Sequence, residues 1–83
     1  MYIAMWDLPG CLPEADPASF DSFEEARKFL ADEVDGIIDA CLMCGDRKQA
    51  VAWKVLRDGI KKASQAPLHE TAPNNYVFSV VEE

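Results

Sequence analysis

Two cysteines, Cys41 and Cys44, are the first residues in the sequence whose spacing is typical of a chemical site. The C-x-x-C spacing occurs in zinc sites and in redox pairs. Zinc takes four ligands, and Cys11 with His69 could complete such a set. However, the pair is predicted to lie at the C-terminal end of a helix, where the dipole opposes thiolate formation. We therefore expect structural thiols, with no metal and no cofactor.

Other catalytic patterns are missing from the sequence. His69 is the single histidine and lies beside Glu70 in a proline-rich segment, outside any known motif. The sequence has no phosphate-binding loop, dinucleotide fingerprint, nucleophile elbow or H-E-x-x-H motif. The sequence therefore predicts a protein that is not an enzyme. A small zinc-stabilised or thiol protein that uses Cys41 and Cys44 stays open as an alternative.

Four carboxylates fall on one flank of a predicted helix at about 100° per residue. They are Glu25, Asp32, Asp35 and Asp39, here called the acidic flank. Such a row is usually a solvated face. Because like charges at this spacing cost helix stability, the row is also a candidate recognition surface for a basic partner. A negative row can also imitate DNA phosphates and block a DNA-binding protein or nuclease.

The following helix carries the opposite charge. Arg47, Lys54, Arg57 and Lys61, here called the basic ridge, lie opposite its apolar arc. The simpler interpretation is that the ridge balances the acidic flank within the molecule, and the alternative is an acidic partner. Trp53 is predicted at the rim of the apolar arc, and tryptophan is common at interface hot spots. It is therefore a candidate partner-binding residue together with the acidic flank.

The elements that position these residues begin with two short strands. Residues 1–6 are aromatic and apolar and end at a proline-glycine turn signal, which predicts a strand, and Ala18–Phe20 are predicted to pair back on it. Ser22 and Glu25 form a capping box that opens a helix to about Cys44. Its apolar face recurs at spacings of three and four: Phe23, Ala26, Leu30, Val34, Ile37, Ile38 and Cys41. Gly36 marks a point where this helix could kink or break.

A second helix and a last strand complete the predicted order. Gly45 is a C-cap residue, and Asp46 with Gln49 forms a second capping box, which predicts a helix over 47–63. Its predicted apolar arc is Val51, Ala52, Val55, Leu56, Gly59, Ile60 and Ala63. Residues 64–75 hold two prolines and an Asn-Asn pair and are predicted to be loop. Tyr76–Val81 is rich in strand formers, with Tyr76, Phe78 and Val80 on one face.

These elements predict a single α+β domain over residues 1–83. Its small antiparallel sheet of two to three strands packs against two helices in the order β-(β)-α-α-β. One core is expected to contain Tyr2, Phe23, Leu30, Val34, Ile37, Val51, Val55, Leu56, Ile60, Phe78 and Val80.

Composition fits a folded domain and limits its partners. The hydrophobic fraction of the 83 residues is 49%, and the net charge is −7. Residues 1–46 carry a net −9 and residues 47–83 a net +2. A chain this acidic is not expected to bind nucleic acid or acidic membranes directly, because both need a basic surface. The N-terminus has no basic region or cleavage site typical of a signal peptide, so a cytoplasmic protein is expected.

Two segments resemble the small accessory proteins of actinobacterial phages. The first includes Leu12-Pro13-Glu14 and continues from Asp16 to Ala26, as a proline-bearing loop, a phenylalanine and a capped helix. The second is the closing strand from Tyr76 to Glu82. The resemblance implies a phage gene product that acts on the host or its defences, in the host cytoplasm. We therefore expect a non-enzymatic, acidic protein-binding module whose partner is a bacterial protein with a basic surface.

Overall fold

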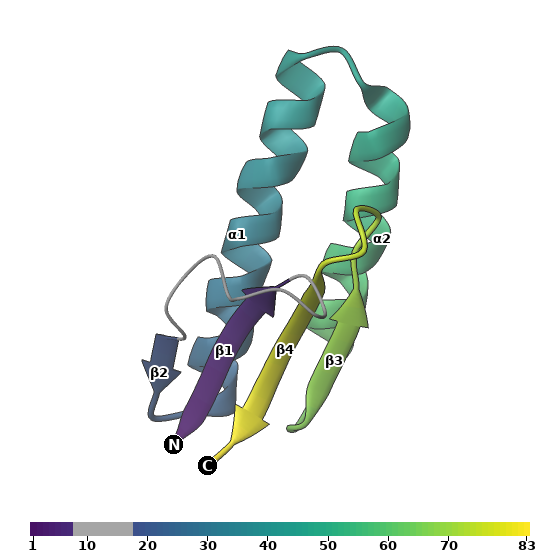
Figure 1. The fold of residues 1–83 in the computed structure, drawn as a ribbon. Helices are drawn as coiled ribbons and strands as arrows, with labels where there is room; N and C mark the ends of the chain where they lie inside the picture. Colours follow the sequence, from purple (N-terminus) through teal and green to yellow (C-terminus); the bar gives the residue numbers. More distant parts are fainter. Residues whose placement is uncertain (8–17) are drawn as a thin grey trace.

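The computed structural model describes residues 1–7 and 18–83. Two helices and four strands form an α+β fold, with four strands where the sequence predicted two to three. The described elements are β1 (Tyr2–Asp7), β2 (Ala18–Phe20), α1 (Phe23–Met43), α2 (Arg47–Lys62), β3 (Leu68–Thr71) and β4 (Val77–Glu82) (Figure 1).

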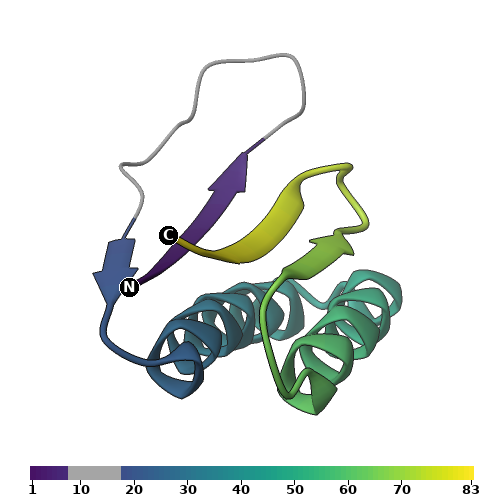
Figure 2. The same ribbon diagram turned by 90° about the horizontal axis from the view of Figure 1, so that it is seen from below.

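The strands form one antiparallel sheet in the order β2-β1-β4-β3. The central pair of strands matches Tyr2 with Glu82 and Trp6 with Phe78. Both helices lie against the same face of this sheet, giving a two-layer arrangement (Figure 2). The two helices are antiparallel, and their connection lies well beyond the ends of the strands (Figure 1). The connected end of the helical hairpin therefore projects past the sheet (Figure 1).

Local signals set the bounds of α1 as the sequence predicted. The side chain of Ser22 accepts a hydrogen bond from the amide of Glu25 at 3.2 Å, which caps the first turn. The helix continues through Gly36 without a break and ends at Met43. Gly45 follows with φ = 78°, a left-handed conformation that glycine adopts without steric cost.

The cap of α2 was also predicted correctly, but the buried face of this helix was not. Asp46 accepts from the amide of Gln49 at 3.2 Å and starts the helix. The predicted core residues Val51 and Val55 are 59% and 69% exposed, whereas Trp53, predicted at the rim, is only 5% exposed. The residues of α2 that are buried are Ala50, Trp53, Leu56 and Ile60. The helix is thus rotated so that its largest side chain enters the core.

The segment predicted as loop over residues 64–75 contains β3. Leu68–Thr71 pair with β4, from Leu68 opposite Val80 to Thr71 opposite Val77. A tight turn joins the two strands, with the amide of Asn75 donating to the carbonyl of Ala72 at 2.9 Å. Leu68 and Ala72 are buried, so this strand closes one side of the core.

The core lies between the sheet and the helical hairpin. Most residues predicted for it are buried: Phe23, Leu30, Val34, Leu56, Ile60, Phe78 and Val80. Tyr2 and Ile37 are partly buried and pack against this cluster. The chain ends are adjacent, with the amide of Glu83 donating to the carbonyl of Met1 at 2.8 Å. Within the described ranges, no helix has both the length and the apolar character needed to cross a membrane.

Candidate functional site

The acidic flank is only partly free for a partner. Glu25, Asp32 and Asp39 are exposed on α1, as a recognition surface requires. Asp35 is instead half-buried and accepts a hydrogen bond from Arg57 of α2 at 3.1 Å. One predicted contact residue is therefore used to join the two helices. This is also the single ion pair between α1 and α2 within the described part of the chain.

Arg57 lies between two carboxylates. Its side chain is 26% exposed, and its Nε is 3.6 Å from the carboxylate of Asp58, too far for a hydrogen bond. The hydrogen bond to Asp35 and the charges of both carboxylates raise the pKa of Arg57, outweighing the opposing effect of partial burial. The guanidinium therefore stays charged at any physiological pH. Of the four residues in the basic ridge, Arg57 is thus the one that pairs with the acidic flank in the described ion pairs.

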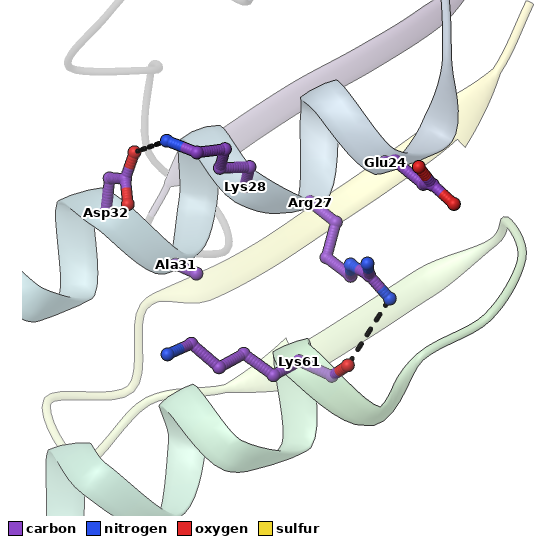
Figure 3. A pocket seen from close by; sticks show the side chains of 6 residues that line it. All are labelled: Glu24, Arg27, Lys28, Ala31, Asp32 and Lys61. Carbon is purple, nitrogen blue, oxygen red and sulfur yellow. Dashed lines mark hydrogen bonds and ion pairs between the residues drawn. The ribbon is translucent and has the colours of Figure 1, made fainter.

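A charged groove of about 500 Å³ lies between the first turns of α1 and the C-terminal end of α2. Figure 3 shows Arg27 extending from α1 across this groove to the end of α2. Its Nη1 donates to the carbonyl of Ala63 at 2.7 Å and to that of Lys61 at 3.3 Å. These carbonyls belong to the end of a helix, where a cation is favourable. Arg27 therefore has a structural role in this groove. The groove's lining is Glu24, Arg27, Lys28, Ala31, Asp32 and Lys61.

Replacing Arg27 with methionine is expected to lower the free energy of unfolding by about 1–2 kcal/mol, since charge-assisted hydrogen bonds to two carbonyls are lost. Methionine keeps the aliphatic part of the side chain and the helix propensity. The matched control is Lys28→Met, because Lys28 is exposed and, among the described residues, its ion pair is with Asp32 of its own helix. Its expected cost is below about 0.5 kcal/mol. Urea denaturation followed by circular dichroism distinguishes the two variants, and equal losses would contradict the assigned role of Arg27.

A second hollow, of about 300 Å³, lies beside the exposed carboxylates. Phe20 of β2 and Phe29 of α1 line it, and here it is called the Phe20–Phe29 hollow. The remaining lining residues are Glu25, Lys28 and Asp32, all on α1. Lys28 and Asp32 form an exposed ion pair at 2.9 Å. Two members of the acidic flank thus border an apolar depression, which the sequence did not predict because the depression joins residues of different elements.

The two phenylalanines are held by a series of aromatic contacts that extends into the core. The ring centroids of Phe20 and Phe29 are 5.3 Å apart, and Phe29 is 5.9 Å from Trp6. Trp6 stacks on Phe78 at 6.1 Å, and Phe78 meets Trp53 edge-on at 6.1 Å. Such ring pairs stabilise the fold by more than the burial of their apolar area alone. The floor of the hollow is therefore fixed by the core.

The remaining candidates are far less suited to a site. Trp53 is buried, which corrects its prediction as a partner-binding residue. Cys41 is half-buried and Cys44 is exposed, and both thiols are free. Cys11 lies outside the described residues. Within residues 1–7 and 18–83, no group of three or more histidine, cysteine or carboxylate side chains is placed to hold a metal ion.

Comparison with known proteins found no counterpart. No family model, no curated protein and no solved structure matches this chain.

Proposed function

We propose that this chain is a non-enzymatic, acidic protein-binding module, a phage accessory protein that binds and modulates a bacterial host or defence protein. The contact surface is the exposed part of the acidic flank, formed by Glu25, Asp32 and Asp39. The proposed partner presents a basic surface to it. The net charge of −7 supports this choice, because it steers cationic surfaces toward the protein and repels acidic ones.

One observation carries the proposal: two flank carboxylates border an apolar hollow. Protein interfaces combine a desolvated apolar centre with a polar rim, and the hollow with its neighbouring carboxylates has this arrangement. Glu25 and Asp32 supply the rim, while Phe20 and Phe29 supply partly buried aromatic surface. Exposed ion pairs alone contribute little affinity. The hollow supplies the apolar contact that the charges lack.

The charge spacing favours a basic protein surface over DNA mimicry. Glu25, Asp32 and Asp39 are seven residues apart, which places consecutive carboxylates about 10.5 Å apart along the helix axis. A DNA strand carries one phosphate for about every 3.4 Å of its axis. The pairing of Asp35 with Arg57 removes the carboxylate that would shorten this spacing. The exposed row is thus sparser than the phosphates that a mimic would imitate.

Capture of a partner from a bacterial lysate, identified by mass spectrometry, tests the proposal. The triple variant Glu25→Gln, Asp32→Asn, Asp39→Asn is expected to weaken binding of the captured protein about tenfold, because three exposed ion pairs contribute about 0.5 kcal/mol each. Wild-type binding is also expected to weaken as salt rises from low to physiological concentration.

The matched control changes the net charge equally at other exposed positions, by Glu33→Gln, Glu82→Gln and Glu83→Gln. This control is expected to keep most of the affinity. Equal weakening by both triple variants would show that only net charge matters and would contradict a contact surface on α1. A captured partner whose binding does not depend on salt would contradict it as well.

A further inference from the structure

We infer that the Phe20–Phe29 hollow binds a single arginine side chain of the partner protein, an inference that rests on the proposed function. The hollow is shallow and open, with a volume of about 300 Å³, which suits one side chain lying across it. Its lining surface is mostly apolar and includes Phe20 and Phe29, and the acidic residues Glu25 and Asp32 border it. This combination is the one that a guanidinium group prefers.

The position of Phe29 on α1 brings aromatic and acidic groups together. Glu25 precedes Phe29 by four residues and Asp32 follows it by three, so both carboxylates are neighbours of the ring on the helix surface. A cation within about 6 Å of a ring centroid is attracted by the ring's quadrupole. A guanidinium placed over this ring therefore has a carboxylate one helical turn away in either direction.

Other occupants fit the lining less well. A carboxylate guest would be repelled by Glu25 and Asp32. An aliphatic side chain would cover the two rings but would form no hydrogen bond with the carboxylates beside them. An ammonium group is more strongly hydrated than a guanidinium and lacks its planar stacking surface, so lysine gains less from the rings.

Lys28 opposes a cationic guest and provides the sharpest test. Its ammonium group pairs with Asp32 at 2.9 Å, but both side chains are mostly exposed, at 76% and 60%. Such a pair is weak, so an incoming guanidinium can replace Lys28 on Asp32. Removing the positive charge of Lys28 should strengthen binding of arginine, which a merely structural ion pair would not do.

The probe is N-acetyl-arginine methylamide, added to the full chain and followed by NMR with labelled phenylalanine rings. We expect shifts of the Phe20 and Phe29 resonances that saturate, and weaker binding of the lysine and leucine methylamides. Lys28→Met is expected to tighten arginine binding about two- to fivefold, and Glu25→Gln to weaken it by a similar factor. Glutamine at this position keeps the capping box, so the helix is preserved.

The matched control is Glu33→Gln, which removes an equal charge from an exposed position of α1 outside the hollow. An equal loss of arginine affinity in Glu25→Gln and Glu33→Gln would overturn the site. The same holds if the leucine or lysine methylamide binds as tightly as the arginine methylamide. If arginine causes no shift of the phenylalanine resonances while binding of the captured partner still depends on the acidic flank, this inference alone is overturned. If arginine binds to the hollow but the captured partner binds equally well to the acidic-flank variant, the proposed function is overturned instead.

Discussion

Replacing Trp53 with alanine is expected to lower the free energy of unfolding by about 3–5 kcal/mol, whereas Val55→Ala should change it by less than about 0.5 kcal/mol. Trp53 is 5% exposed and Val55 is 69% exposed, although they are two positions apart on α2. A chain of 83 residues is expected to have about 4–12 kcal/mol of stability in total. The Trp53 variant is therefore expected to unfold at a much lower urea concentration.

The two measurements together test which face of α2 is buried. Alanine has a higher helix propensity than valine, so Val55→Ala should be neutral or slightly stabilising at an exposed site. Urea denaturation followed by far-ultraviolet circular dichroism gives both values without relying on tryptophan fluorescence. If Val55→Ala lowers the free energy of unfolding by several kcal/mol and Trp53→Ala changes it little, the arc that the sequence predicted is the buried face of α2.

The incorrect arc on α2 shows what periodicity leaves undetermined. The helix has more apolar residues than one face can bury, so two overlapping arcs satisfy the spacing rule. The buried residues Ala50, Trp53, Leu56 and Ile60 are also spaced by three and four, and this arc includes Trp53, whose side chain removes far more apolar area from water than a valine does. Spacing alone therefore does not choose between the two arcs, because a sequence pattern counts positions without weighing the apolar area that each side chain buries.

The helix ends were predicted because their chemistry is local. Ser22 and Asp46 each accept a hydrogen bond from an amide three residues later, and Gly45 adopts a left-handed conformation. These signals need no knowledge of the rest of the fold. By contrast, β3 is a short strand next to two prolines, and it forms because β4 offers an edge to pair with. Its existence depends on tertiary context, which outweighs local propensity.

The same distinction applies to the candidate site. The acidic flank is visible in the sequence because its members lie on one helix. Asp35 is drawn to Arg57 of α2, and this depends on how the two helices pack. The Phe20–Phe29 hollow joins a strand residue to a helix residue, so no spacing rule predicts it. The sequence therefore indicated the charge of the surface, and the fold determined where that charge meets apolar area.

Phe78→Ala is the second substitution with a large expected effect, about 3–5 kcal/mol lost from the free energy of unfolding. Phe78 is 1% exposed on a central strand, and its ring contacts both Trp6 and Trp53. Its loss leaves a cavity between sheet and helices and removes partners from both tryptophans. The near-ultraviolet circular dichroism of the remaining folded protein should therefore weaken as well.

Two further variants, Phe78→Leu and Val81→Ala, distinguish the effect of packing on stability from the effect of strand propensity. Phe78→Leu keeps an apolar side chain and is expected to cost less than Phe78→Ala, because a smaller cavity remains. Val81→Ala changes the other face of the same strand, where the side chain is 39% exposed, and its expected cost is below about 1 kcal/mol. Both alanine variants lose a good strand former, so a difference between them measures burial. Equal costs at the two positions would mean that the sheet has no preferred buried face, and the aromatic contacts from Trp53 to Phe20 would then not hold the floor of the hollow.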